Sequence, residues 1–426
     1  MSVRKRVLIV SATTGYQLRA FDEAAGRLGV ELAFATDRCH LLDDPWRDRA
    51  IPVRFYDEPS SVDAIVASAR EAPIDAIVAV GDRPAVLAAV AAATLGLPGN
   101  PPAAARTSAN KNLTRAALAS AGLPSPWFET LPLSVDLTDL LARARFPCVV
   151  KPLELSGSRG VMRADSPQQL EDALARLRKL LDRPQVRAER NPAHERVLVE
   201  GYIPGREFAV EGLIDRGCFH SLAVFEKPDP LEGPFFEETI YVTPPDSAAD
   251  GKLEALIVHT IGAAARAIGL QHGPVHAECR VNARGVYVLE VAARPIGGLC
   301  ARALQFCDGD TLMSLEELIL RHARGEAVDS RTRETAASAV MMIPVPRQGY
   351  LKGVEGLDAA RDVSGISEIE ITAKPDQMLQ PLPEGASYLG FIFSRAATSR
   401  EAVAAVREAH SRLTFRIDQP LLLSGT

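Results

Sequence analysis

The sequence has few tryptophans and lysines, no long apolar run and no excess of positive charge. It has 426 residues, of which two are tryptophan, and only eight of its 48 basic residues are lysine. No apolar run approaches the roughly 18 residues of a membrane-spanning helix. The formal net charge is −6, and neither half of the chain is strongly basic. We therefore expect neither a membrane anchor nor nonspecific binding to nucleic acid.

Cysteine is also scarce and irregularly spaced. The six cysteines form no CxxC pair, which in a chain of this length argues against a disulfide framework and against a zinc site. The first residues, MSVRKR, precede an apolar run of about six residues, which is too short for the core of a secretory signal. These features favour a cytoplasmic protein with reduced, mostly buried thiols.

Three common fingerprints of nucleotide-binding proteins and hydrolases are missing as well. The chain contains no GxGxxG, no GxxxxGKS/T and no GxSxG. Their absence argues against a dinucleotide-dependent dehydrogenase, a P-loop nucleotidase and a hydrolase with a nucleophile elbow.

The rest of the composition is that of an ordinary globular protein. Charged residues make up 24% and the hydrophobic set 47%, and the length predicts about three domains. Between residues 7 and 95, short apolar runs alternate with helical patterns. This alternation is typical of parallel βαβ units, so we predict a Rossmann-like α/β domain over residues 1–105.

The βαβ rhythm stops after residue 105. We predict an α+β core over 106–328, with a separate subdomain at about 125–198, and a C-terminal α+β unit over 329–426. Residues 227–246, rich in Pro, Glu and Phe, are predicted to be a loop. Ser166 with Gln169, and Thr398 with Glu401, have the spacing of capping boxes at helix starts. The strands of the core are expected at 146–152, 197–200, 207–214, 219–225, 275–281 and 285–291.

A lysine at a strand end, followed by a loop of small residues, is the first candidate binding element. Lys151 ends the strand 146–152, and residues 155–161 read LSGSRGV. Small residues let backbone N–H groups approach a phosphate closely, and the lysine adds a compact positive charge. An ordinary hairpin turn is the alternative interpretation of this loop.

Two glutamates that interrupt an apolar hairpin are the second candidate. A turn centred on Arg284 would place Glu278 and Glu290 opposite each other, with Cβ atoms about 5 Å apart. Two carboxylates this close repel unless a cation lies between them, and oxygen-only ligation suits Mg²⁺. The alternative is a pair of glutamates on the solvent face. Arg294, four residues past Glu290, could hold a second anion, or it could be a surface residue or a structural partner of another side chain.

Taken in order along the chain, these signals resemble the ATP-grasp family, and the resemblance covers essentially the whole sequence. It implies a Rossmann-like first domain, an ATP-grasp fold of two α+β subdomains that clamp the nucleotide, and a C-terminal unit. By resemblance, Lys111 and Lys151 match the phosphate-binding lysines, and Glu278 and Glu290 match the metal ligands. Arg294 and Lys151 match the catalytic cations. The implied nucleotide contacts are Ser156, Gly157, Ser158, Gly160 and Val161 in the mobile loop, Glu200, Tyr202 and Ile203 in the adenine hinge, and Glu207 at the ribose.

Within this family the motif LEVAARPIGG is similar to that of carboxylate–amine ligases, bacterial L-amino acid ligases among them. Many members have an Asn two residues after the last metal glutamate, but here that place is Ala292. The resemblance implies ATP and two Mg²⁺ ions, with Mn²⁺ as an alternative metal, and leaves the second ion's ligands incomplete. The implied reaction joins a small carboxylate to an amine through an acyl phosphate, and a homodimer is a family-level expectation.

Several assignments stay open at this point. Arg294, Gly297, Gly298 and His276 are expected near the substrate, but His276 is more readily explained as a satisfied core histidine than as a proton carrier. The 227–246 loop could meet the amine substrate or be solvated. A biotin-carboxylase-like enzyme that uses bicarbonate, or a noncatalytic nucleotide-binding protein with the same fold, would share the clamp.

Overall fold

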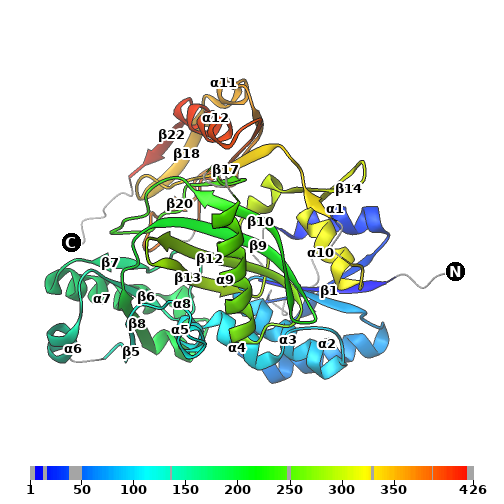
Figure 1. The fold of residues 1–426 in the computed structure, drawn as a ribbon, viewed down its shortest axis with the longest axis horizontal. Coiled ribbons are helices and arrows are strands. Elements are labelled where there is room, and N and C mark those ends of the chain that lie inside the picture. Colours follow the sequence, from blue (N-terminus) through cyan, green and yellow to red (C-terminus); the bar gives the residue numbers. More distant parts are fainter. Residues whose placement is uncertain are drawn as a thin grey trace.

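The structure is a computed structural model that describes residues 5–12, 17–37, 50–134, 137–246, 251–327, 331–385 and 387–419 (Figure 1). Its first part is the α/β domain predicted from the alternating pattern. Four parallel strands form a sheet in the order β3-β2-β1-β4. The elements are β1 Arg6–Ser11, α1 Leu18–Leu28, β2 Glu31–Thr36, β3 Ile51–Pro52, α2 Glu58–Glu71, β4 Ala76–Val80 and α3 Asp82–Leu95.

Two short helices lead from this domain into a small four-stranded sheet. The predicted boundary at 105/106 falls inside the first of them, so the chain passes between the two parts in helical form. The small sheet is antiparallel, in the order β5-β8-β6-β7. The elements are α4 Pro102–Ala109, α5 Lys111–Ser120, β5 Phe128–Pro132, α6 Leu137–Arg143, β6 Cys148–Pro152, β7 Met162–Ala164, α7 Pro167–Leu181, α8 Pro184–Arg187 and β8 Arg196–Gly201.

The centre of the molecule is an eight-stranded sheet in the order β13-β12-β9-β10-β11-β17-β21-β19. In Figure 1, α9 lies across one face of its green strands. Apolar side chains from the first domain and from this sheet, such as Leu8, Ile65 and Phe208, belong to one continuous buried cluster. The elements are β9 Arg206–Asp215, β10 Cys218–Lys227, β11 Ile240–Thr243, α9 Lys252–Ile268, β12 Gly273–Asn282, β13 Gly285–Ala292, β14 Gln305–Asp308, β15 Thr311–Ser314 and α10 Leu315–Ala323.

The C-terminal segment adds strands to this sheet and also forms a small core of its own. Strand β17 pairs with β11, so the sheet runs on into residues predicted to form a separate unit. All seven residues of β17 are buried. The elements are β16 Thr332–Arg333, β17 Ala337–Ile343, β18 Gly349–Glu355, α11 Leu357–Arg361, β19 Ile366–Ile371, β20 Met378–Leu379, β21 Gly390–Ala396, α12 Ser399–Ser411 and β22 Thr414–Asp418. The predicted boundary at 328/329 lies outside the described residues.

The structure corrects two local predictions. The 227–246 region is not all loop, because β11 lies within it and pairs on both sides. At Ser166 only half of a capping box forms: the Ser166 side chain accepts from the Gln169 N–H, whereas the Gln169 side chain accepts from Asp165. The capping box of Thr398 and Glu401 is complete, as predicted.

Two further findings concern membranes and thiols. In the described part of the chain, no helix combines the length and the apolar character that crossing a membrane requires. The five described cysteines are free thiols, and Cys39 lies outside the described residues.

Candidate active site

One cavity of about 400 Å³ collects nearly all of the predicted site residues. It lies where the first domain, the small sheet and the central sheet meet, and residues from the C-terminal segment complete it. Gly160 is the exception, because it does not line the cavity. The predicted residues that do line it are Lys111, Lys151, Ser156, Gly157, Ser158, Val161, Glu200, Tyr202, Ile203, Glu207, His276, Glu278, Glu290, Arg294, Gly297 and Gly298.

The glycine-rich loop between β6 and β7 needs its small residues for its backbone shape. Gly157, Ser158 and Gly160 have φ values of 65°, 54° and 74°, in the left-handed region. A Cβ on Gly160 would also lie 3.0 Å from side-chain atoms of Leu177 and Leu180. The N–H of Gly160 donates to the carbonyl of Pro383, 2.8 Å away, so the C-terminal segment holds this loop.

Lys151 projects into the cavity from the end of β6, within a buried network of ion pairs. Its Nζ lies 2.5 Å from Glu200 Oε1, and Arg115 Nε donates to Glu200 Oε2 at 2.6 Å. Burial lowers the pKa of Lys151 to about 8, with Arg115 and Lys111 acting in the same direction against Glu200. Burial opposes ionisation of Glu200, but Arg115 and Lys151 outweigh it and lower the Glu200 pKa to about 2. Both carboxylate oxygens of Glu200 are therefore bound to cationic side chains. A nucleobase at the hinge would have to be contacted by backbone groups instead.

Lys111 reaches the same cavity from the first turn of α5. The Asn110 side chain caps this helix by accepting from the N–H groups of Asn112 and Leu113. Lys111 Nζ donates to the carbonyl of Leu155 at 2.7 Å and lies 3.9 Å from Glu290 Oε2. It therefore bridges the glycine-rich loop and the hairpin.

The β12–β13 hairpin places its two glutamates opposite each other, as predicted, but not by the predicted turn. The turn pairs Asn282 with Gly285, which would leave Glu278 out of register with Glu290. A bulge between Glu278 and Cys279 inserts one extra residue on β13 and restores the Glu278–Glu290 pairing. The predicted pairing is thus confirmed, whereas the predicted turn centre was wrong.

Carboxylates and one lysine crowd around Glu278. Lys227, at the end of β10, donates to Glu207, Glu238 and Glu278 over 2.8, 2.6 and 2.9 Å. Burial opposes the Lys227 charge, but these carboxylates raise its pKa well above the usual value. The three carboxylates lie close enough to hold a metal ion, and the single positive charge of Lys227, which contacts all three, offsets part of their negative charge.

Glu207 has a second cationic partner. Arg280 Nε donates to Glu207 Oε2 at 2.7 Å, on the side of the carboxylate away from Lys227. The acceptor that the resemblance assigns to a ribose is therefore held in place from two sides. A ribose hydroxyl would have to share it with these cations.

His276 lies between two glutamates on the same face of the sheet. Its Nδ1 is hydrogen-bonded to Glu211, and its Nε2 is 3.4 Å from Glu278 Oε1. Burial lowers its pKa, but Glu211 and Glu278 outweigh burial and raise it to about 9. His276 is therefore a cation at neutral pH that orients Glu278, which fits the interpretation as a satisfied histidine better than that of a proton carrier.

Arg294 is fixed by an ion pair with the first domain. Its Nε and one terminal nitrogen contact the Asp82 carboxylate at 2.7 and 3.3 Å, and the latter nitrogen lies 3.8 Å from Glu290. Burial opposes ionisation of Asp82, but Arg294 and then Lys111 and His276 lower its pKa. Gly297 and Gly298 follow on the cavity wall. A Cβ on Gly298 would lie 3.1 Å from the Phe391 ring, whereas Gly297 has open space.

Four important residues were not predicted as part of the site: Asp82, Arg115, Glu211 and Lys227. Glu238 belongs to the 227–246 segment, which the sequence left open between the amine substrate and solvent, and it lines the cavity. Lys227 carried a usable signal, because it is one of only eight lysines and ends an apolar strand, as Lys151 does. The others are acidic or basic residues whose partners are far away in the sequence. No local pattern marks such partners.

The donor set fits a divalent cation. Glu278 and Glu290 are opposed on adjacent strands and line one cavity, and carboxylate oxygens are the ligands that Mg²⁺ prefers. Ala292 is buried and offers no side-chain ligand. The cavity thus combines carboxylates with the cations Lys111, Lys151 and Arg294, an arrangement suited to a polyphosphate with its metal.

Comparison with known families identifies three consecutive regions. Residues 22–99 match the ATP-grasp N-terminal domain, 144–303 the ATP-grasp domain, and 341–418 the L-amino acid ligase C-terminal domain 2. The dapdiamide A synthase of Enterobacter agglomerans is 24% identical over 313 residues, which cover 71% of each chain. The chain spans between 45% and 71% of the length of the curated relatives that it matches.

Solved structures agree with these matches. The L-amino acid ligase from Bacillus licheniformis has a TM-score of 0.79 and 26% identity, and the alignment covers 98% of this chain and 99% of that one. A biotin carboxylase from Campylobacter jejuni shares the fold at 17% identity, with a TM-score of 0.64 and coverage of 97% and 92%. Together the matches show that this chain is a member of the ATP-grasp superfamily whose C-terminal region is of the L-amino acid ligase type.

Proposed function

We propose that this protein is an ATP-dependent carboxylate–amine ligase that forms an amide or peptide bond. The substrates we propose are two amino acids, or an amino acid and another small carboxylate. The observation that carries the proposal is the convergence, in one cavity, of Lys111, Lys151 and Arg294 with the opposed pair Glu278 and Glu290. The C-terminal match to L-amino acid ligases supports the substrate class.

In the proposed complex, ATP lies between the small sheet and the central sheet. The backbone of the hinge at Tyr202 and Ile203 meets the adenine, and Glu207 meets the ribose. Lys151, Lys111 and the loop 156–161 surround the phosphates. Phosphoryl transfer requires little from the protein except positioning and charge neutralisation, and these groups provide both.

Glu278 and Glu290 are the residues that would hold Mg²⁺. When bound, the metal neutralises charge on the β- and γ-phosphate oxygens. His276 keeps Glu278 ionised and oriented, while Glu211 fixes the ring of His276 and also accepts from the N–H of Ile296 at 3.1 Å. We propose two ions, of Mg²⁺ or Mn²⁺, although Ala292 leaves the second with fewer protein ligands.

Arg294 would bind the carboxylate substrate and the phosphoryl group transferred to it, with the backbone of Gly297 and Gly298 beside them. An oxygen of the carboxylate attacks the γ-phosphorus, the bond to the β–γ bridging oxygen breaks, and ADP leaves. The amine nitrogen then attacks the acyl carbon, and the carbon–oxygen bond to phosphate breaks. The amine loses a proton during this step, for which Glu238 is a suitable acceptor. Burial, and then the charge of Glu278, raises its pKa to about 7.

Water must be kept from the acyl phosphate, which hydrolyses. The glycine-rich loop covers the cavity in the proposed complex, and its contact with Pro383 gives the C-terminal segment a part in closing it. The 227–246 region also contributes, since Glu238 and Phe236 line the same cavity.

The alternative to a ligase is a biotin-carboxylase-like reaction, because a biotin carboxylase has the same fold. A coupled phosphate-release assay over pairs of amino acids, with product masses determined, separates the candidates. The proposed ligase releases phosphate only with a suitable pair and yields the condensed product. Release that depends on bicarbonate would indicate a carboxylase, and no release with any pair would favour a noncatalytic nucleotide-binding protein.

A further inference from the structure

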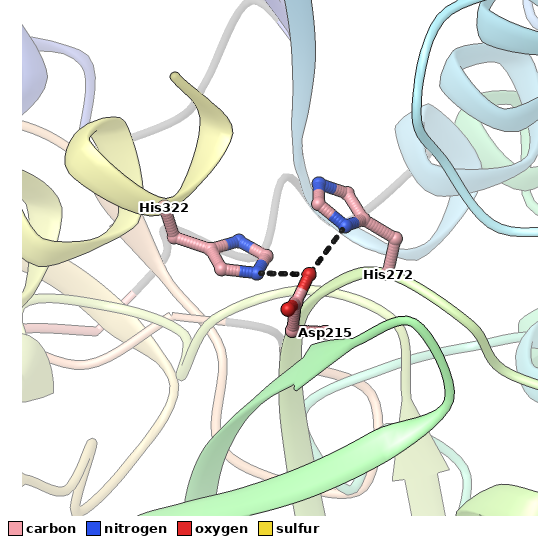
Figure 2. A group of neighbouring side chains, drawn as sticks. All are labelled: Asp215, His272 and His322. Carbon is pink, nitrogen blue, oxygen red and sulfur yellow. Dashed lines mark ion pairs between the residues drawn. The ribbon is translucent and has the colours of Figure 1, made fainter. Parts of the chain in front are cut away.

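Three side chains with metal-ligating atoms meet outside the active-site cavity. Asp215 ends β9, His272 immediately precedes β12, and His322 lies in the last turn of α10 (Figure 2). Asp215 Oδ1 is 3.8 Å from His272 Nδ1 and 3.9 Å from His322 Nε2, and all three atoms lie within 4.8 Å of one another. Figure 2 shows both rings turned towards the same carboxylate oxygen.

The Nε2 atom of His322 is buried and lacks a hydrogen-bond partner among the described residues. The side chain is 3% exposed. The 3.9 Å to Asp215 is too long for a hydrogen bond. Burying a polar nitrogen without a partner costs free energy, so most such atoms in folded proteins have one. A bound ion between Nε2 and the carboxylate would supply the partner.

The three ligands are carried by well-fixed parts of the fold. Asp215 precedes a tight turn in which Arg216 and Gly217 have φ values of 47° and 81°. The backbone N–H groups of Gln271 and His272 both donate to the Asn100 side chain, at 2.8 and 3.1 Å. Helix α10 packs against α1 of the first domain. Sites on rigid elements hold their ligand geometry more closely than sites on loops.

Both imidazoles are in the form that binds metals. Burial lowers the pKa of His272, and burial together with the neighbouring His272 lowers that of His322 to about 4. Each ring is therefore neutral at pH 7 and has a lone pair to offer. The two rings are stacked, with centroids 4.4 Å apart. Asp215 is 45% exposed, so an ion can reach the cluster from solvent.

We propose that Asp215, His272 and His322 form a zinc site, with water completing the coordination. Two imidazoles and one carboxylate suit Zn²⁺, whereas Mg²⁺ prefers oxygen ligands alone. Ligand atoms about 2.0 Å from a tetrahedral ion are about 3.3 Å apart, so small side-chain rotations close the observed distances around zinc. The cysteine pattern, which argued against a zinc site, carries no information about ligands of this kind.

The ion would join three parts of the molecule. Asp215 and His272 each lie four residues along their strand from Glu211 and His276, a separation of about 13 Å. The site therefore holds the far ends of the two strands that carry the Glu211–His276 pair, and fastens them to α10. Its expected effect is on folding stability and on strand register, separate from the metal that activates ATP.

The test is zinc binding by the full-length chain after chelation and dialysis, measured in excess Mg²⁺ to occupy the active-site carboxylates. ZnCl₂ is titrated by calorimetry, bound metal is quantified, and Tm is recorded with and without zinc. The variants are Asp215→Asn, which keeps the side-chain shape, and His272→Gln and His322→Gln, which each replace an imidazole by a neutral amide. The control is His259→Ala, an exposed histidine on α9. Glu278→Gln tests whether zinc binds in the active-site cavity instead.

We expect about one zinc ion per wild-type chain, a rise in Tm on binding, and at least tenfold weaker binding by each of the three variants. The His259→Ala and Glu278→Gln proteins should bind zinc as the wild type does. A Co²⁺-loaded wild type should show visible absorption that Asp215→Asn lacks. The proposal is overturned if the wild type binds no zinc, or if Asp215→Asn and His272→Gln, folded by circular dichroism, bind it unchanged.

Discussion

At the scale of single residues, the candidate active site consists of charges paired across long stretches of sequence. Asp82 in the first domain fixes Arg294, and Arg115 in α5 fixes Glu200. Each buried charge is matched by another, because an unpaired charge in a cavity wall would be costly. Lys111, Lys151 and Arg294 line one cavity, in which a polyphosphate can bind.

Arg294 offers the sharpest substitution at this scale. Arg294→Ala should lower kcat/KM for phosphate release about 10²–10³-fold, since one preorganised donor to the transferred phosphoryl group is lost. Arg294→Lys should recover little, because lysine cannot form the paired contact with Asp82. Steady-state kinetics with a productive substrate pair provides the measurement. Arg302→Ala, which removes a partly exposed arginine bound to Glu368 and Glu370, is the control. Near-normal turnover in Arg294→Ala would refute the role assigned to Arg294.

The raised pKa of Glu238 leads to a prediction about how the rate of amide formation falls at acidic pH. A base must be ionised to accept the amine proton, and the Glu238 pKa is raised to about 7, so the rate should increase as the pH rises through about 7. Glu238→Gln should be slow and should lack this limb. Its neighbour Glu237, whose pKa is raised by burial alone and which does not line the cavity, provides the matched control Glu237→Gln. An unchanged acidic limb in Glu238→Gln would exclude Glu238 as the base.

At the scale of elements, the strands and helices with strong periodicity were predictable from the sequence. A strand bulge and a very short strand were not. Apolar runs predicted β1, β4, β6 and the β9–β10 hairpin, and capping residues predicted the start of α12. The bulge in β13 has no local signal, because an extra residue is tolerated only where the opposite strand and the cavity require it. Strand β11 was missed because it is only four residues long within a segment rich in Pro and Glu.

The same distinction separates the site residues that were predicted from those that were missed. Residues within a motif, such as the loop 156–161 and the hairpin glutamates, follow from spacing in the sequence. Asp82 and Glu211 act through partners that only the folded chain brings near, at Arg294 and His276. Local patterning carries no information about those pairings.

The contact between the C-terminal segment and the glycine-rich loop leads to a prediction about how tightly phosphate release is coupled to amide formation. Glu384 forms a paired salt bridge with Arg176 on α7, and the neighbouring Pro383 accepts from Gly160. Glu384→Gln weakens this link by up to about 1 kcal/mol, a factor of about five. We expect a loop that closes less well, and therefore more phosphate released per amide formed. Glu368→Gln, a C-terminal glutamate bound to Arg302, should leave this ratio unchanged. An unchanged ratio in Glu384→Gln would contradict a closing role for this contact.

At the scale of the whole molecule, the central sheet joins regions that family comparison treats separately. The pairing of β11 with β17 makes the L-amino acid ligase type region part of the sheet that carries Glu278 and Glu290. Residues of this region, Tyr388 and Phe391 among them, line the cavity. Nucleotide binding should therefore stabilise the molecule as a unit.

MgADP provides the test of that coupling. At about 100 times its Kd it should add about 2.7 kcal/mol to the free energy of unfolding, seen as a rise in a single Tm. Lys151 is charged below its pKa of about 8, so the stabilisation should be present at pH 7 and weaken as the pH rises through about 8. Lys151→Met should lose most of it, whereas Lys179→Met, at the end of α7, should keep it. Equal stabilisation of Lys151→Met and wild type would contradict phosphate binding by Lys151.

The central claim is that the carboxylate substrate is activated as an acyl phosphate. The most direct measurement uses a carboxylate substrate labelled with ¹⁸O in both oxygens, with ATP, Mg²⁺ and the amine, and determines the isotope content of the released phosphate. The account predicts one ¹⁸O atom per phosphate, transferred from the carboxylate, and one retained in the amide. Amide formation with unlabelled phosphate, or phosphate release that requires bicarbonate and forms no amide, would contradict it.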